Sequence, residues 1–465
     1  MADLAQAAKR ADDERKGDAA PAASPPGPRG LPWFGNLGEL RANPMAFFTR
    51  IAREYGGIAS FRYGRETTYL VSSPALIREL LIDNRDKYRK NTRYKAMQRI
   101  LGQGLLLSEG SVWKAQRLTA QPSFRPSQLK RQVEWMADVT DEFLELLDAQ
   151  VGAGALDMHR EFLRLAQRIS GMLTLGPRFA ARAEELFEIS ERIRRAWPAP
   201  PRGLLGSFRV PSPLRLRRLE RSLGELDALV LRIIAEERDT AGEDESILGR
   251  IVRSSERDGR RFTDAELRDQ VVTLIVAGYE TTAATLSWTH YLLDLHPQVR
   301  ERLEREVDEV AGNRPITREL LDELPLTERI LQESLRLYSP IHSLSRVALE
   351  DNHIGGYLIP KGSTVVVSLH ATHRLPECWK DPDAFDPDRF LAERASERPN
   401  HAYIPFAAGH RNCIGGTLAM LETKLILAAI ARRFRLALVP GFPVEPCAGT
   451  TMFPRHGMMM TVERR

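Results

Sequence analysis

The chain has 465 residues and a formal net charge of +5, and charged residues make up 28% of it. A small net charge without a long basic run argues against nucleic-acid binding, and the length permits one large domain or several. The three cysteines, Cys378, Cys413 and Cys447, have no paired spacing. This pattern argues against a disulfide framework and indicates a reducing compartment.

The N-terminal segment contains no sign of a membrane anchor. Residues 1–24 are rich in alanine and charge, without an apolar run long enough for a signal peptide or a membrane span. We therefore expect a disordered tail over 1–24, one folded domain over 25–465, and a cytoplasmic monomer. The proline- and glycine-rich residues 25–38 are expected to be extended, with Trp33 and Phe34 packed against the fold.

The next part of the chain alternates helical and β patterns. Residues 44–55 and 74–83 are predicted to be helices. The β-like runs 58–63 and 67–71 lie on either side of Gly64, so they predict a hairpin.

Trp113 and Arg117 stand four residues apart, so they share one face of the helix predicted after Gly110. An indole N–H and a guanidinium suit a carboxylate ligand, although such a pair alone is more often a surface cation–π contact. Residues 127–239 are predicted to be mostly helical, with an apolar, proline-rich interruption at 197–213.

A capping box from Thr263 to Glu266 predicts the start of a central helix, whose apolar pattern continues for about 30 residues, or ~45 Å. Gly278, Glu280 and Thr281 lie in its apolar middle, where local propensity opposes glycine and adjacent threonines. A local rule broken in a core helix indicates a functional site. We expect Gly278 to let a flat ligand lie close, Thr281 to bond a carbonyl of the preceding turn or free it for water, and Glu280 to relay protons.

Two further helices are predicted at 297–310 and 325–338, and the second carries Glu333 and Arg336. A Glu–Arg pair three residues apart on a helix is ordinarily a solvated ion pair of small energetic value. Residues 354–368 suggest a β-hairpin.

Residues 406–416, FAAGHRNCIGG, place Cys413 in a glycine-rich turn directly before a helix predicted over 417–434. The free N–H groups and the dipole of a helix N-terminus favour a thiolate, and glycines permit positive φ and close approach of a flat ligand. Phe406 is placed to shield the sulfur, and Arg411 to reach an anion. One thiolate is too few ligands for a structural zinc ion, but it suffices for a haem iron.

This loop resembles the haem-ligand loop of the cytochrome P450 monooxygenases at Phe406, Gly409, Arg411, Cys413 and Gly415. The resemblance extends over most of the chain, and the protein looks like the soluble bacterial type. It implies a mainly α fold with a smaller β-rich region, a single large domain in the triangular prism of the family. It also implies haem b as the cofactor, with the Cys413 thiolate as the axial iron ligand.

The family resemblance also implies roles for other residues of the chain. It implies that Thr281 steadies the iron-bound oxygen group and its water, and that Glu280 helps deliver the protons for O–O cleavage. It also implies that Ala277 and Gly278 lie beside the haem. It makes Glu333, Arg336 and Arg389 a structural triad behind the Cys413 loop. The haem propionate partners would be Trp113, Arg117 and Arg346, and the substrate-lining candidates Leu105, Leu106, Leu107, Leu274, Ile341, Leu344, Thr451, Met452 and Phe453.

The implied reaction inserts one oxygen atom of O2 into a small hydrophobic substrate. A terpenoid is preferred over a fatty acid or a steroid, because no cation other than Arg202 or Arg209 suggests itself for a fatty-acid carboxylate. Electrons would come from a separate ferredoxin with its reductase, or from a flavodoxin. The alternatives are a haem-thiolate peroxygenase or isomerase, which needs no external electrons, and a non-enzymatic haem sensor.

An acidic electron carrier needs a basic surface to bind. We expect it to be attracted by the basic residues predicted near the Cys413 loop, which are Lys114, Lys130, Arg131, Arg411, Lys424, Arg432 and Arg433.

Overall fold

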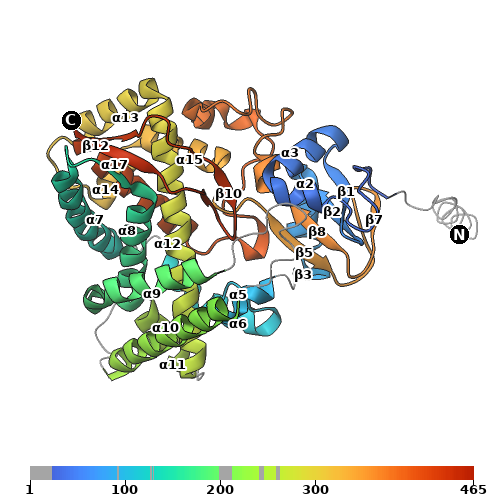
Figure 1. Ribbon diagram of the computed structural model, residues 1–465, viewed down its shortest axis with the longest axis horizontal. Helices are drawn as coiled ribbons and strands as arrows, with labels where there is room; N and C mark the ends of the chain where they lie inside the picture. Colours follow the sequence, from blue (N-terminus) through green and yellow to red (C-terminus); the bar gives the residue numbers. More distant parts are fainter. Residues whose placement is uncertain are drawn as a thin grey trace, which may run out of the picture.

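The computed structural model describes residues 24–91, 94–125, 128, 130–197, 212–239, 246–257 and 262–465. Residues 1–23 of the predicted tail and residues 198–211 of the predicted interruption lie outside these ranges. Figure 1 shows a mainly helical body on one side and a smaller β-rich part on the other, with the long helix α12 (Asp264–Leu295) crossing the helical body. The predicted fold class, mainly α with a smaller β-rich region, is therefore confirmed.

The β-rich part is built on one five-stranded sheet in the order β1-β2-β8-β5-β3. Its strands are β1 (Ile58–Tyr63), β2 (Glu66–Val71), β8 (Thr364–Val367), β5 (Leu344–Ala348) and β3 (Tyr88–Lys90). β1 and β2 form the predicted antiparallel hairpin, while β2 and β8 run parallel. Helices α2 (Leu37–Ala42) and α3 (Pro44–Tyr55) belong to the same part of the molecule, and Phe47 and Phe48 of α3 pack on Phe61 of β1.

The hairpin suggested for residues 354–368 is wrong in its pairing. β7 (Tyr357–Ile359) pairs with β6 (Asn352–Ile354), whereas β8 pairs with β2 and β5. The chain turns at Gly362, which has a φ of +82° and donates its N–H to the Ala348 carbonyl. This turn sends β8 into the sheet, where Val365 and Val367 are fully buried.

The helical body surrounds α12 and two short sheets. Its other helices are α5 (Lys95–Leu101), α6 (Gly110–Ala120), α7 (Lys130–Gln150), α8 (Met158–Leu175), α9 (Ala183–Ala196), α10 (Pro213–Asp239), α11 (Ile247–Arg257), α13 (Pro297–Val310), α14 (Arg318–Asp322), α15 (Pro325–Leu337) and α17 (Gly416–Arg433). The short sheets are β4-β12-β9, from Ala155–Asp157, Met459–Arg464 and Phe434–Leu438, and the pair β10 (Pro446–Ala448) and β11 (Met452–Pro454). The other α-helices of the described residues are α4 (Pro74–Arg78), which continues as the π-helical η1 (Glu79–Asp83), and α16 (Leu369–Thr372).

The N-terminal segment is packed differently from the prediction. Trp33 and Phe34 are 66% and 40% exposed, so the expectation that both pack against the fold is wrong. The chain makes a tight turn there, with paired hydrogen bonds between Leu31 and Gly35, and the turn carries both rings outward. The Arg65 guanidinium covers one face of the Trp33 ring at 4.1 Å. None of the helices in the described ranges combines the length and apolar character that crossing a bilayer requires.

Helix α12 begins at the predicted capping box, since the Thr263 hydroxyl accepts from the Glu266 N–H and the Glu266 carboxylate accepts from the Thr263 N–H. Gly278 in its middle allows close packing of α8. A Cβ at Gly278 would lie 2.4 Å from the Ser170 hydroxyl oxygen of α8. That hydroxyl donates to the Ile275 carbonyl at 3.3 Å. The prediction that Gly278 makes room for a flat ligand is therefore wrong, because α8 occupies the space.

Gly278→Ala should destabilise the protein by about 1 kcal/mol, because the new methyl displaces the Ser170 hydroxyl and this cost exceeds the gain in helix propensity. The free energy of unfolding of the two proteins in urea measures the difference. In a Ser170→Ala background the cost should fall, since the displaced oxygen is absent. An equal cost in both backgrounds would contradict the packing role of Gly278.

Candidate functional site

The loop before α17 is closed by backbone hydrogen bonds. The Cys413 N–H donates to the Phe406 carbonyl at 2.9 Å, and the Asn412 N–H donates to the Gly409 carbonyl at 3.1 Å. Helix α17 begins three residues after Cys413, at Gly416, close to the predicted start. The Cys413 side chain is exposed, whereas Cys378 and Cys447 are buried. Cys413 is therefore the cysteine that the fold presents to a ligand.

The glycines of this loop have different roles. Gly409 has a φ of +73°, and a Cβ there would lie 2.3 Å from the Leu81 carbonyl oxygen, so both backbone conformation and space require glycine. Gly415 has a φ of −95° and is not in the positive-φ region that the prediction allowed for it. The Phe406 ring lies against Gly416, where a Cβ would come within 3.3 Å of the ring. Phe406 thus packs at the start of α17.

The surroundings of Cys413 act on its thiol in opposite directions. The surrounding protein desolvates the sulfur and raises the pKa of Cys413, while the Gly415 N–H and the Arg117 guanidinium lower it. Arg117 is held in place because it donates to the Asn412 carbonyl at 2.9 Å and to the Asn412 side-chain oxygen at 3.0 Å. The predicted propionate partner Arg117 therefore braces the loop and offers a cation to the thiolate.

A cluster of cations lies beside the loop, in a narrow cleft lined by Lys90, Glu109, Arg346 and Arg411 among others. Arg411 donates to the Glu109 carboxylate at 2.7 Å, and its guanidinium lies 4.0 Å from the Trp113 ring centre. Burial, followed by the charges of Arg411 and Arg346, lowers the pKa of Lys90 to about 7. Glu109 is the carboxylate that raises it. Arg85 and Arg89 also line the cleft, and one carboxylate does not balance five basic side chains, so this cleft favours a further anion.

An unsatisfied donor in the same place supports this interpretation. The Nη1 of Arg411 is buried without a hydrogen-bond partner among the described residues, as is the Nδ1 of His410. Buried donors are usually paired, so an unpaired guanidinium nitrogen indicates a missing acceptor. An exposed thiol at a helix N-terminus next to a site for carboxylates fits haem b, whose iron takes a thiolate and whose edge carries two propionates.

Lys90 was not predicted from the sequence. It becomes part of the cation cluster because β3 pairs with β5, which places Lys90 opposite Arg346 in the sheet register. These residues are far apart in the chain, and no local sequence pattern predicts which strand a three-residue strand will pair with. The Lys90 ammonium also donates to the Leu106 carbonyl, which ties the segment before α6 to the cluster.

The middle of α12 presents the predicted oxygen-activation residues. Ala277 is exposed although α12 is the central helix. The Thr281 hydroxyl donates to the Ala277 carbonyl at 2.8 Å, which is one of the two arrangements expected for it. The Tyr279 hydroxyl donates to the Glu280 carboxylate at 3.4 Å. Burial raises the pKa of Glu280, whereas the Tyr279 hydroxyl and the Arg194 charge lower it.

A second carboxyl group lies behind this part of α12. Glu422 of α17 is 3% exposed, and the Thr282 hydroxyl donates to its Oε2 at 3.4 Å. Burial raises the pKa of Glu422 to about 8, and the Thr282 hydrogen bond lowers it only in part. The side chain ties α17, which follows the Cys413 loop, to α12. It escaped the sequence reading because a single Glu in an apolar helix has no partner visible in the chain.

The predicted triad forms behind the loop. Glu333 and Arg336 are fully buried and make a bidentate pair at 2.7 and 2.8 Å, and Arg389 reaches the Glu333 carboxylate at 3.2 Å. Arg336 also donates to the His373 carbonyl at 2.8 Å, and the His373 Nε2 accepts the Ile404 N–H at 3.0 Å. His373 thus connects the triad to the segment that leads into the Cys413 loop.

The substrate-lining candidates differ in their surroundings. Leu106 is exposed, and Leu274, Ile341 and Leu344 are half-buried. Met452 has no exposed surface. The Phe453 ring stacks on His159 at 6.3 Å, so it packs toward α8. Leu105, Leu107 and Thr451 are buried, and Arg202 and Arg209 lie outside the described residues.

Two of the residues expected to attract an electron carrier are not at the surface. The Arg411 side chain is 8% exposed and pairs with Glu109, and the Lys424 side chain is 5% exposed and pairs with Glu328. The prediction of a surface role is wrong for both, because neither side chain reaches the surface.

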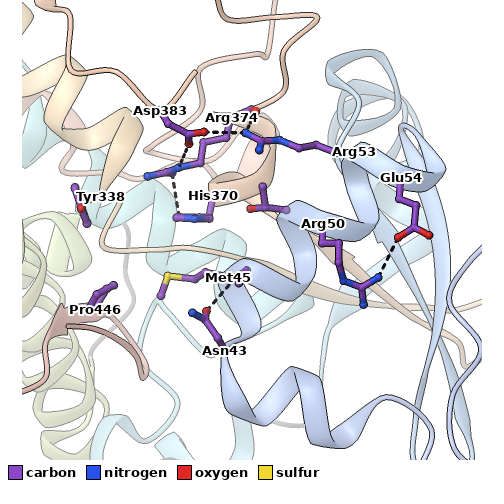
Figure 2. A pocket seen from close by; sticks show the side chains of 12 residues that line it. Asn43, Met45, Arg50, Arg53, Glu54, Tyr338, His370, Arg374, Asp383 and Pro446 are labelled. Carbon is purple, nitrogen blue, oxygen red and sulfur yellow. Dashed lines mark hydrogen bonds and ion pairs between the residues drawn. The ribbon is translucent and has the colours of Figure 1, made fainter. Parts of the chain in front are cut away.

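Figure 2 shows a surface pocket of about 710 Å³ that lies apart from these groups. It lies between α3 and Tyr338, which follows α15, His370 of α16 and Pro446 of β10. Its charged side chains are already paired. Arg53 and Arg374 both contact Asp383 at 3.3 Å, and Arg374 also donates to His370 at 3.1 Å. None of the predicted site residues lines this pocket, and we do not assign it to the site.

Comparison with known proteins identifies the family. Residues 25–462 match the cytochrome P450 family, so the chain belongs to it. It is a cytochrome P450 monooxygenase with a haem-thiolate cofactor.

Individual relatives agree with this assignment. The chain is 33% identical to cyclooctat-9-en-7-ol 5-monooxygenase of Streptomyces melanosporofaciens, covering 89% of this chain and 90% of the relative. It is 30% identical to pentalenene oxygenase of Streptomyces avermitilis, covering 92% and 95%. The crystal structure of the cytochrome P450DA haem domain superposes with a TM-score of 0.86 at 26% identity, covering 96% of this chain and 99% of that one.

Glu333→Ala should lower the free energy of unfolding by about 3–5 kcal/mol, because it leaves two buried guanidinium groups without their carboxylate. Chemical denaturation of both proteins measures this loss. Glu54→Ala serves as the control, since Glu54 pairs with Arg50 at 3.0 Å in a half-exposed position, and it should cost less than about 1 kcal/mol. Similar losses for the two variants would contradict the triad's supporting role.

Glu422→Gln should change how stability depends on pH. The raised pKa of Glu422 means that the unfolded chain loses this proton from about pH 4.5 upward, whereas the folded protein keeps it until about pH 8. The wild type therefore loses roughly 3–5 kcal/mol of stability over this interval through Glu422, and the amide variant does not. Denaturation of both holoproteins at each end of the interval should show the variant gaining on the wild type as pH rises. A constant difference would contradict a buried, protonated Glu422.

Proposed function

We propose that this protein hydroxylates compact terpenoids, holding haem through Cys413 and receiving electrons from a separate ferredoxin. The observation that carries the proposal is the exposed Cys413 thiol just before α17, beside a cleft lined by five basic side chains and one carboxylate. In this proposal residues 25–465 form the catalytic unit, and it acts in the cytoplasm.

The residues that hold the cofactor act through charge. Desolvation raises the pKa of Cys413, and the Gly415 N–H and the Arg117 cation, which lower it, are in place before any ligand binds. Lys90, Arg346 and Arg411 would hold the haem carboxylates, and the ring of Trp113 lies under the Arg411 guanidinium. These side chains come from four separate parts of the chain, so haem binding depends on the complete fold.

Haem held by these residues would supply the oxidising chemistry. The chain's own residues supply protons and exclude water. The Tyr279 hydroxyl donates a hydrogen bond to the Glu280 carboxyl group, and burial raises the pKa of that group, so it is better able to hold and pass on a proton than an exposed carboxyl group. The Thr281 hydroxyl, bonded to the Ala277 carbonyl, is placed on the exposed side of α12 to receive it.

The substrate class is supported by the relatives and by the side chains available. The names of two relatives contain cyclooctat-9-en-7-ol and pentalenene, which are cyclic terpenoids. The half-buried candidates Leu274, Ile341 and Leu344 are apolar and offer no charged group to fix a carboxylate. Apolar walls with few polar groups suit a compact hydrocarbon skeleton.

The proposal also assigns the electron donor to a separate ferredoxin. The described residues form one P450 domain matched over nearly its whole length by a haem domain, and the P450 family generally needs redox partners. Of the basic residues predicted from the sequence, Lys114, Arg131 and Arg433 are exposed in the structure. An acidic ferredoxin is the partner that such a surface favours.

Turnover with cyclic terpenes tests the proposal. The haem-loaded protein, with a ferredoxin, its reductase and NADPH, should hydroxylate at least one member of a panel of cyclic terpenes, and fatty acids and steroids in parallel should react more slowly. Cys413→Ala should abolish the activity, because the iron loses its thiolate. Turnover with peroxide alone and none with the electron donors would contradict the proposed reaction, and preferred oxidation of a fatty acid would contradict the substrate class.

A further inference from the structure

The Glu109 carboxylate joins three segments around the cation cluster. Its Oε2 accepts a hydrogen bond from Arg411 of the Cys413 loop at 2.7 Å, and its Oε1 accepts the backbone N–H of Lys90 in β3 at 3.1 Å. Glu109 itself stands at the N-cap position of α6, and its side chain makes no capping hydrogen bond there. An N-cap side chain commonly accepts from the first turn of its own helix. The Glu109 side chain instead connects α6 to β3 and to the loop.

The contacts of Arg411 hold its guanidinium in one orientation. Its Nη2 donates to Glu109 and to the Ser108 carbonyl at 2.9 Å, and the Trp113 ring covers one face of the group at 4.0 Å. The other terminal nitrogen, Nη1, is buried without a hydrogen-bond partner among the described residues. Glu109 and Ser108 therefore occupy one end of the guanidinium and leave the other end for a further acceptor.

The backbone beside Glu109 is itself fixed. The Ser108 hydroxyl donates to the Gln116 side chain of α6 at 2.6 Å, and Gln116 also donates to the Gln103 carbonyl at 2.9 Å. Ser108 and Gln116 are both buried. The Glu109 carboxylate thus projects from a rigid part of the chain, so it is able to position Arg411.

The charge of Glu109 by itself opposes the binding of an anion. A carboxylate repels a second carboxylate nearby, and it competes with that group for the same guanidinium. An acid at this place favours haem binding only through geometry, because fixing a long side chain in the bound orientation reduces the entropy lost on binding. Charge and geometry therefore predict opposite effects when Glu109 is removed.

We propose that Glu109 is a positioning residue that orients Arg411, so that the Nη1 of Arg411 is free to donate to a haem carboxylate. Glu109 acts through Arg411 and is not itself a haem ligand. The inference rests on the haem binding in the proposed function, because it assigns the residue that prepares one cation of the anion site.

Haem transfer from the holoprotein to excess apomyoglobin tests this role. Glu109→Ala should lose haem about tenfold faster than the wild type or more, since the Arg411 side chain is no longer held. Glu109→Gln should be intermediate, because its single amide oxygen replaces only one of the two contacts. Glu79→Ala is the matched control, since Glu79 also accepts a backbone N–H, that of Gly355 at 3.2 Å, and does not line the cleft. Its rate should equal that of the wild type.

Two further measurements show whether Glu109 acts through Arg411. In an Arg411→Ala background, Glu109→Ala should change the rate of haem loss by less than about twofold. The propionate bending bands in the resonance Raman spectrum should shift in Glu109→Ala as they do in Arg411→Ala, and should stay at the wild-type position in Glu79→Ala. A residue that only stabilised the fold would leave these bands unmoved.

Slower haem loss from Glu109→Ala would identify Glu109 as a competitor for Arg411 and would overturn the inference. An equal effect of Glu109→Ala in both backgrounds would overturn it as well. A wild type that holds no haem would contradict both this inference and the proposed function. A wild type that holds haem through the predicted contacts but oxidises no terpene would contradict the proposed function alone.

Discussion

The position of the reactive cysteine depends on one buried charge network. The Glu333 carboxylate holds Arg336 and Arg389, and Arg336 in turn holds carbonyls of the segment from His373 to Ala384. His373 then accepts the N–H of Ile404, which leads into the Cys413 loop. A buried ion pair stabilises only when its remaining donors are satisfied. Here those donors are used to fix irregular backbone that no sheet or helix would hold.

The site contains ionisable groups whose pKa values the surrounding protein shifts from their ordinary values. Lys90 is crowded by other cations, and Glu422 is desolvated without a counter-charge. Cys413 is desolvated by the surrounding protein while a cation and a backbone N–H oppose that effect. Shifted pKa values are common at functional sites, because a group whose pKa is shifted changes its charge readily when a ligand or a proton binds. The cation cluster favours binding of an anion, and Glu280 and Glu422 are carboxyl groups whose pKa is raised by burial.

The sequence-based prediction succeeded where the evidence was local. The capping box at Thr263 places the start of α12, and the cysteine turn places the start of α17. It failed at Gly278, where a glycine in an apolar helix was interpreted as space for a ligand although it is occupied by Ser170. It also failed at Trp33 and at the pairing of β8, because side-chain exposure and strand partners depend on segments far away in the chain.

Local patterns were sufficient to recognise the helices, the cysteine ligand loop and the family, because caps, periodicity and short motifs depend on neighbouring residues. The triad could be named from spacing, yet its link to the loop through His373 required the fold. The pairing of Lys90 with Arg346 and of Glu422 with Thr282 could not be read from the chain at all. Burial and charge act through space, so residues hundreds of positions apart acquire their chemistry only when the tertiary structure brings them together and removes water from around them.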